Sequence, residues 1–246
     1  MVKRYSTRDK MYHAMLSHNF DPADANITSW VRLFLAIVLA NLESMPVEAP
    51  TPLILLACHV PEENQPSFRR TTRRLAQLFA NEDVKDRWVI LPERTFREVL
   101  TERSSTSPFF PDLRTHREIA AACLHIMARE LRFNICGLSS SFVLNADVED
   151  LEDSIAANIP SHLHLACCTW TYHISQLQAF EPTLVQMISN FFRLHFLFWL
   201  EVMSLTKKSV KKALIQLDTM KVRREGVFLC TWNLHFMTRR HLSLMR

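Results

Sequence analysis

Residues Phe191–Leu205 read FFRLHFLFWLEVMSL and form the densest apolar and aromatic run of the chain. Phe192, Phe196, Trp199 and Met203 recur at steps of three and four residues, the spacing of one face of an α-helix. Neighbouring leucines widen this stripe, so the pattern predicts a central core helix that buries most of its circumference. The run is too short and too charged to cross a bilayer.

Length and composition limit what can surround this helix. The chain has 246 residues, 48% of them apolar and 22% charged, which suits a globular protein of one large or two small domains. The net charge of +4 does not by itself indicate a nucleic-acid or membrane partner. The opening residues carry no apolar signal sequence and no stretch reaches the length of a membrane span. We therefore expect a cytoplasmic protein without a membrane partner.

Two residue types narrow the chemistry. Gly137 and Gly226 are the two glycines of the chain, so neither a Walker loop nor a dinucleotide-binding fingerprint can be written in it. We expect no nucleotide and no cofactor. Scarce glycine also favours helices over hairpins, because tight hairpin turns use glycine at positive φ. The six cysteines form no CxxC pair and lie mostly in apolar patterns, which predicts reduced, buried thiols.

The first part of the chain alternates helical patterns with proline-rich breaks. We expect helices at Asp9–His18, at Trp30–Leu42 behind an N-cap at Ser29, at Leu53–Cys58, at Ser67–Phe79 and at Thr95–Leu100, with a short strand at Trp88–Leu91. Three helices followed by a strand are the order of a winged-helix module. We therefore assign residues 1–26 to an N-terminal helix and linker, and residues 27–103 to a winged-helix-like module.

The second part of the chain has a wholly helical pattern. Residues 104–114 form a linker, residues 115–220 a helical arm, and residues 221–246 an atypical C-terminal tail. In the arm we expect helices at His116–Phe133 with an N-cap at Thr115, at His162–Leu177, at Phe191–Leu205 entered from Pro182, and at Lys207–Met220. Gly137 would supply a left-handed stop after the first helix, and Asn145–Asp153 an acidic connector.

The predicted fold class is thus mainly α, with a winged-helix-like module that contains a short β-strand or hairpin, followed by an α-helical bundle or arm. Trp170, Phe196 and Trp199 are the expected core anchors of the arm, and Trp170 and Trp199 should pack near one another on neighbouring helices. We also expect the chain to expose apolar surface, and so to self-associate or bind a partner protein.

One predicted helix has a strongly basic face. Arg69, Arg70, Arg73 and Arg74 would line one surface of the Ser67–Phe79 helix, at the position of a winged-helix recognition helix. They are the feature of the sequence that suggests a polyanion or an acidic partner. A solvated surface is the alternative interpretation.

Three ordered stretches carry a resemblance to a known family. They are WVILPERTFREVL at Trp88–Leu100, HREIAAACLHIMARELRFNICGL at His116–Leu138, and LACCTWTYHI with FRLHFLFWLEVMSL at Leu165–Ile174 and Phe192–Leu205. Together they resemble the region that follows the NTPase core in fungal NACHT proteins, which are NLR-like signalling ATPases of the STAND class. The match extends back to MYHAMLSHNF and VRLFLAIVLANL. The resemblance implies a winged-helix domain and a helical arm that work as a signalling switch module of innate immunity, usually ahead of a ligand-sensing repeat domain.

The chain also departs from that family. The ATPase half with its P-loop and Mg²⁺ site is absent. The Leu-His-Pro-Ser-Phe pattern that commonly ends the strand before the matched helix reads PERTF here, with Glu93 where the family's nucleotide-sensing His would fall. A carboxylate repels a nucleotide phosphate. We therefore expect a truncated piece of such a protein that binds no nucleotide.

Three side-chain groups offer chemistry of another kind. His164 and Cys168, four residues apart on one helix, could share a metal ion. An acidic run could hold Mg²⁺, as in helical prenyl-diphosphate enzymes; it comprises Asp147, Glu149, Asp150, Glu152 and Asp153. Cys123 with His125 could form a thiol nucleophile, although adjacent helical positions point apart. No second ligand pair stands at a fixed spacing, so we expect no metal.

The expected function is that of a non-enzymatic signalling and protein-interaction module. A winged-helix DNA-binding protein that uses the Arg69–Arg74 helix is the first alternative, and a helical metal-dependent enzyme is the second. The NACHT family uses its winged helix for domain packing, so we expect a protein partner rather than DNA. A shared fold alone does not determine function.

Overall fold

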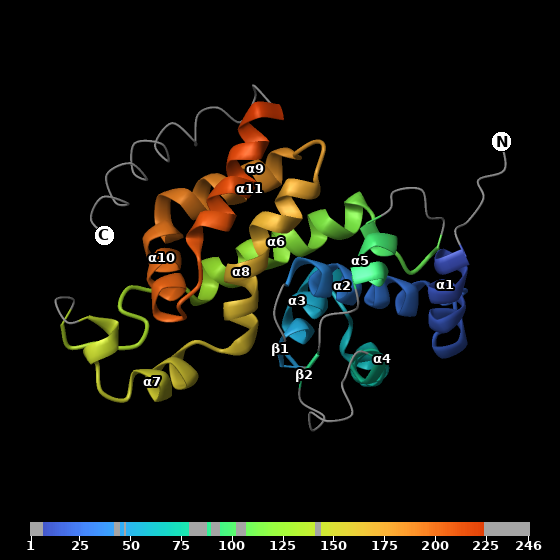
Figure 1. The fold of residues 1–246 in the computed structure, drawn as a ribbon, viewed down its shortest axis with the longest axis horizontal. Coiled ribbons are helices and arrows are strands. Elements are labelled where there is room, and N and C mark those ends of the chain that lie inside the picture. Colours follow the sequence, from blue (N-terminus) through green and yellow to red (C-terminus); the bar gives the residue numbers. More distant parts are fainter. Residues whose placement is uncertain are drawn as a thin grey trace.

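The computed structural model describes residues 7–41, 45–46, 48–78, 88–89, 94–101, 107–140 and 144–223. The first part of the chain contains α1 (Thr7–Asn19), α2 (Ala25–Ala40), β1 (Met45–Pro46), α3 (Pro50–Cys58), η1 (Glu62–Asn64), α4 (Gln65–Leu78), β2 (Trp88–Val89) and α5 (Arg94–Thr101). The second part contains α6 (Leu113–Glu130), η2 (Asn145–Asp147), α7 (Leu151–Asn158), α8 (Ser161–Gln176), α9 (Pro182–Asn190), the π-helical η3 (Phe191–His195), α10 (Phe196–Leu205) and α11 (Val210–Arg223). The predicted mainly α fold with a helical bundle is confirmed (Figure 1).

Two short strands belong to the first part of the chain. β1 and β2 pair antiparallel, with Met45 opposite Val89 and Pro46 opposite Trp88. The sequence predicted three helices followed by a strand, and the described order α2, β1, α3, α4, β2 adds a strand between the first two of these helices. The sequence did not predict β1, because a two-residue strand that contains a proline has no periodicity to read. The end of the strand predicted at Trp88–Leu91 lies outside the described residues.

α2 is the interior helix of the module. Asp24 is its N-cap, since the carboxylate accepts hydrogen bonds from the backbone amides of Asn26 and Ile27 at 2.9 and 3.0 Å. The N-cap predicted at Ser29 is wrong, because that residue lies inside the helix. Nearly every side chain from Trp30 to Ala40 is buried. The helix therefore has neighbours on all sides.

α6 also begins at a different cap from the one expected. Asp112 is the N-cap: its carboxylate accepts from the Thr115 amide at 2.7 Å, and its own amide donates to the Thr115 hydroxyl at 3.4 Å. Thr115 is thus the third helical residue of a capping box, and its prediction as the cap is wrong. α6 ends at Glu130, so Phe133, predicted inside the helix, lies beyond it and is 79% exposed.

The turn after α6 is held from two sides. Asn134 and Gly137 have left-handed φ angles of 48° and 65°, and the Asn134 side-chain amide bonds the backbone of Leu138 at 2.8 and 2.7 Å. Gly137 has the predicted left-handed conformation, but α6 already ends at Glu130 with an extended Leu131 as its C-cap, so Gly137 is not the residue that stops the helix. From α10, the Glu201 carboxylate accepts the backbone N–H groups of Asn134 at 3.2 Å and Ile135 at 3.0 Å.

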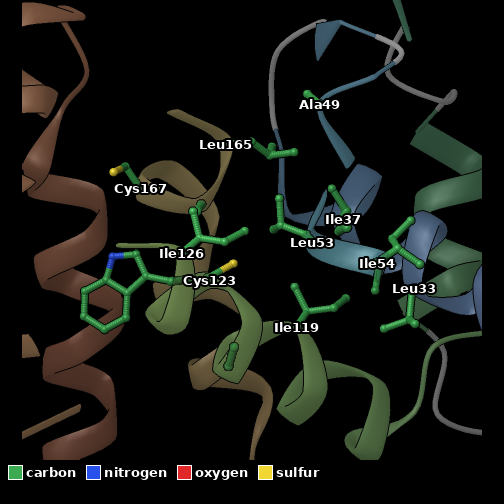
Figure 2. Packing of buried hydrophobic residues seen from close by; sticks show 14 of the residues in the cluster. Leu33, Ile37, Ala49, Leu53, Ile54, Ile119, Cys123, Ile126, Leu165 and Cys167 are labelled. Atoms are coloured by element: carbon green, nitrogen blue, oxygen red, sulfur yellow. The ribbon is translucent and has the colours of Figure 1, made fainter. Parts of the chain in front are cut away.

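The core joins the two parts of the chain. α2 and α3 pack against α6 and α8. Figure 2 shows side chains of these four helices meeting: Leu33 and Ile37 from α2, Leu53 and Ile54 from α3, Ile119, Cys123 and Ile126 from α6, and Leu165 from α8. The buried residues form one continuous cluster on both sides of the predicted linker at 104–114. The module and the arm therefore share one core, and the predicted domain boundaries stay a prediction.

Aromatic rings hold the arm together. Trp170 of α8 and Trp199 of α10 are both fully buried, and their ring centroids lie 6.0 Å apart in a T-shaped arrangement. This is the arrangement expected from the sequence. The Trp199 indole N–H donates to the backbone carbonyl of Cys167 at 3.0 Å. Phe191 lies 4.6 Å from Trp170 and Phe196 lies 5.7 Å from Trp199, centroid to centroid. The T-shaped Trp170–Trp199 contact adds to the stabilisation from burial.

The stretch Phe191–Leu205 differs from its prediction in two respects. The helix opens with a π-helical segment, and Phe191 is buried whereas Phe192 is half-buried. Leu194 and Leu197 are 61% and 59% exposed, so the prediction that this helix buries most of its circumference is wrong. The reason is its place in the fold, since α10 covers one flank of α8 while α2, α6 and α8 form the centre (Figure 1).

The segment predicted as an acidic connector contains the start of a helix. Asn145–Asp153 covers η2 and the first turn of α7, which follows the left-handed Asp150. Acidic residues lie in this first turn, where the helix dipole favours them. The remaining helix predictions are confirmed as elements, with bounds shifted by a few residues. No helix of the described ranges is long and apolar enough to cross a membrane.

Candidate functional site

The basic residues predicted on one helix lie on the outer face of α4. The inner face of α4 packs against α2, where the rings of Trp30 and Phe68 meet edge to face at 5.4 Å between centroids. The buried side chains of α4 are Phe68, Thr71, Thr72, Leu75 and Ala76. This leaves the opposite face to solvent, at the lower edge of the molecule in Figure 1.

All four arginines of this outer face are exposed: Arg69, Arg70, Arg73 and Arg74. We call this surface the arginine face. The Arg74 guanidinium lies 5.8 Å from the ring centroid of Phe20, and among the described residues no carboxylate pairs with any of the four. Like charges four residues apart destabilise a helix by about 0.2–0.5 kcal/mol per pair. The arrangement thus costs the helix a little stability, and an anionic partner would offset it.

Carboxylates lie at the start of this helix. η1 precedes α4 directly, and its Glu62 and Glu63 are both exposed. The N-terminal end of α4 is therefore acidic and its second and third turns are basic. The exposed charge therefore changes from negative on η1 to positive on the arginine face.

A second charged surface lies on η2 and the start of α7. We call it the acidic face; its members Asp147, Glu149, Asp150, Glu152 and Asp153 are all exposed. Glu152 forms an ion pair with Lys207 at 2.9 Å. Within the described residues, no group of three or more His, Cys, Asp or Glu side chains is placed to hold a metal ion. The Mg²⁺ hypothesis thus has no assembled site in this part of the chain.

A pocket of about 770 Å³ lies where the module meets the arm. The ends of α2, β1 and α3 contribute Ala40, Met45 and Ala49, and the arm contributes apolar residues of α7, α8 and α10. Lys207 and Lys208, in the turn between α10 and α11, also line it. Residues far apart in the sequence therefore converge at this pocket.

His164 and Cys168 both line this pocket. The Cys168 thiol lies 3.5 Å from His164 Nε2, so the pair predicted on one helix is in contact. Two ligands are fewer than a structural metal site needs. The sequence predicted the pair, but the convergence with the module could not be predicted because it depends on tertiary packing.

The other proposed thiol site is not assembled. Cys123 is fully buried against Thr169, with 3.9 Å between the sulfur and the hydroxyl. Burial raises the pKa of the Cys123 thiol to about 12. His125 is exposed on another side of α6. A thiol of this kind is a packing residue.

A buried histidine pair was missed by the sequence analysis. His116 of α6 and His173 of α8 face one another with 3.0 Å between their Nδ1 atoms. Burial lowers the pKa of His173 well below its ordinary value, and nearby His116 lowers it further. The helical spacing of each histidine from core residues such as Ile119 and Trp170 indicated burial, but it did not indicate that the two would meet.

Further predicted features fall outside the described residues. They include Glu93, at the position of the family's nucleotide-sensing residue, and the tail from residue 224 onward. Comparisons of the chain with models of protein families, with curated proteins and with solved structures gave no match.

Proposed function

We propose that this chain is a non-enzymatic, cytoplasmic signalling module that works by binding other proteins. The arginine face carries the proposal, because four exposed guanidinium groups stand on a helix whose other side is fixed to α2. Guanidinium groups recognise carboxylates through paired hydrogen bonds. The resemblance to the region after the NTPase core of NACHT proteins supports the same class of function.

An acidic protein surface fits the arginine face better than a DNA duplex does. A recognition helix enters the major groove with its N-terminal residues against the bases. In α4 that end follows Glu62 and Glu63, which are exposed and would approach the phosphates. Binding to DNA depends on neutralising phosphates, so carboxylates at the leading end oppose it.

A second copy of the chain offers a suitable acidic surface. The acidic face on η2 and α7 lies away from α4 in Figure 1, so one copy can present it to the arginine face of another without hindering its own. A contact between two different faces is head-to-tail, and it builds a ring or an open chain of copies. The proposed module would thus assemble with itself or with a protein that carries a similar acidic surface.

Sedimentation velocity at low and high salt tests this function. We expect the chain to self-associate at low salt and to dissociate as salt screens the charges. Changing Arg69, Arg70, Arg73 and Arg74 together to Gln should abolish the association. The matched control changes Arg114, Arg129, Arg132 and Arg193 to Gln, which removes the same charge from exposed positions elsewhere. Equal loss in both variants would show a non-specific charge effect and would count against the arginine face.

DNA binding is the second candidate, because α4 occupies the place of a recognition helix in the order α2, β1, α3, α4, β2. A gel-shift series with a mixed set of duplexes at two salt concentrations separates the candidates. We expect weak binding without sequence preference. A sequence-specific complex that the four Arg→Gln changes remove would replace the protein-binding function with this one.

A further inference from the structure

The described cysteines differ in what surrounds their thiols. Cys123 and Cys167 are fully buried, and burial raises the pKa of both. Cys136 is buried and Cys58 half-buried, and burial is again the main cause that raises their pKa values. The thiolate is the reactive form of cysteine, so these four positions favour the unreactive thiol.

Cys168 has different surroundings. It is half-buried and lines the pocket between module and arm, and its sulfur lies 3.5 Å from His164 Nε2. The two residues are one helical turn apart on α8, which holds them in contact. An imidazole beside a thiol accepts its proton near neutral pH, and this is how thiol nucleophiles are activated.

Positive charge borders the same pocket. Among the described lining residues, the titratable ones other than the pair are Glu152 from α7 and Lys207 and Lys208 from the turn before α11; the described lining residues from α2, β1 and α3 carry no charge. Glu152 forms an ion pair with Lys207 at 2.9 Å, and the formal charges of these three side chains are one negative and two positive. A positive surrounding stabilises a thiolate and attracts an anionic reagent.

The remaining lining residues define the size and polarity of a ligand. The walls include Met45, Ile155, Ile159 and Met203, and the volume of about 770 Å³ is that of pockets that hold small organic molecules. A fitting molecule has a short apolar chain for these walls and an acidic group for the lysines.

We propose that Cys168 is a covalent binding site for small α,β-unsaturated carbonyl compounds that carry an apolar chain and a carboxylate. The sulfur forms a bond to the β-carbon, and the π electrons of the carbon–carbon double bond move to the carbonyl oxygen as an enolate. His164 takes the thiol proton and returns it to the α-carbon. The addition consumes no oxidant or reductant and releases no leaving group. The inference is independent of the protein-binding function.

Two maleimides test the site, since a maleimide is a cyclic unsaturated dicarbonyl. The first is 6-maleimidohexanoic acid, and the second is N-hexylmaleimide, which has a similar chain and no carboxylate. The folded chain is made with Cys230→Ser, because Cys230 lies outside the described residues. Adducts are timed by intact mass and located by peptide mapping. We expect Cys168 to react first, about tenfold or more faster than Cys58, because thiolate fraction and access set the rate.

Four variants serve as controls for the proposed site. Cys168→Ser should remove the fast adduct, whereas Cys58→Ser should leave the rate of adduct formation at Cys168 unchanged. His164→Gln should slow the reaction at pH 7 by about tenfold or more and move the pH–rate midpoint up toward that of an ordinary thiol. Lys207→Gln with Lys208→Gln should reduce the advantage of the carboxylate reagent by about threefold, the size of a partly exposed charge pair.

The outcomes that overturn the proposal are specific. Labelling of Cys168 only after unfolding in urea would show that the pocket does not admit a reagent. If the His164→Gln variant has the same pH–rate profile as the parent chain, His164 does not accept the thiol proton. Equal rates for the two maleimides in the parent chain would show that the pocket does not select ligands with a carboxylate.

Discussion

α4 and α8 are helices of similar length that differ in how much of their surface is buried. α8 is enclosed by α6, α10, α11 and α3, and its Trp170 and His173 have no exposed surface. α4 packs on α2 with one face and offers Arg69, Arg70, Arg73 and Arg74 to solvent with the other. In α8 the buried Thr171 hydroxyl donates to the Gln216 side chain at 2.6 Å, whereas the arginines of α4 point to solvent. Stability should therefore reside in the packing of α8 and its neighbours, and protein binding in α4.

The largest expected effect is at the aromatic contact of α8 with α10. Trp199→Ala removes a fully buried ring that packs on Trp170 and donates to the Cys167 carbonyl. We expect a loss of about 3–5 kcal/mol in the free energy of unfolding. Urea denaturation followed by circular dichroism measures it.

Leu197→Ala is the control for that change. Leu197 lies on the same helix and is 59% exposed, so we expect a change within about 0.5 kcal/mol. Similar losses for Trp199→Ala and Leu197→Ala would contradict the burial described for α10.

The next effect concerns the link between α10 and the turn after α6. Glu201→Ala leaves the N–H groups of Asn134 and Ile135 without their carboxylate acceptor. Hydrogen bonds to charged groups contribute about 1.5–3 kcal/mol, so we expect a loss of about 2 kcal/mol. Glu201→Gln, which keeps one acceptor oxygen, should lose less. Hydrogen exchange at Asn134 and Ile135 should quicken in the Ala variant; unchanged exchange there would refute the link.

A smaller effect should appear on mild acidification. The pKa of His173 is lowered by burial, and its imidazole meets His116, with Tyr172 also in ring contact. The unfolded chain therefore binds a proton near pH 6.5 that the folded chain does not. Stability is complete above that pH and falls below it, by at most about 1.4 kcal/mol per pH unit for one histidine.

His173→Leu should flatten this dependence between pH 7 and 5. A second acid effect belongs to a lower range: burial tends to raise the pKa of Asp112, but its hydrogen bonds to Thr115 prevail and lower it. The stability from this carboxylate is thus lost only as the pH falls below about 4. Loss of stability in the His173→Leu variant already at pH 6 would assign the effect to another group.

The smallest effect on stability is expected at α4. Changing Arg69, Arg70, Arg73 and Arg74 to Gln removes like-charge repulsion from an exposed face, so the free energy of unfolding should change by less than about 0.5 kcal/mol or rise slightly. Thermal unfolding at low and high salt measures it. A large destabilisation would show that the arginines hold the fold, and the contrast with α8 would then fail.

Much of the fold could be predicted from residue patterns. Amphipathic spacing located the helices, and proline with Asp or Asn located their breaks, because these signals are local. Caps were misplaced because Asp24 and Asp112 compete with nearby Ser29 and Thr115 for the same role, and the choice depends on where the backbone turns.

The candidate sites also differ in whether they lie on one element or need several elements to meet. The arginine face follows from one helix, so the sequence was sufficient to find it. The pocket at Cys168 and the His116–His173 pair need two or more elements to meet, and no spacing within one element reports that. Glu201 stands inside the apolar run Phe191–Leu205, and its partners lie 66 and 67 residues earlier in the chain, so the local pattern did not indicate its role.

The π-helical segment η3 sets the rotational phase between α9 and α10. Phe191 and Phe196 are five residues apart, and a π turn, which closes from one residue to the fifth after it, lets both rings reach the tryptophans. Each residue of an α-helix turns the chain by about 100°. Deleting one residue between Phe191 and His195 would therefore swing the inward face of α9, with Leu184 and Ile188, toward solvent. Related chains should tolerate insertions or deletions in the turn at residues 177–181 far more readily than a change of length in this short stretch.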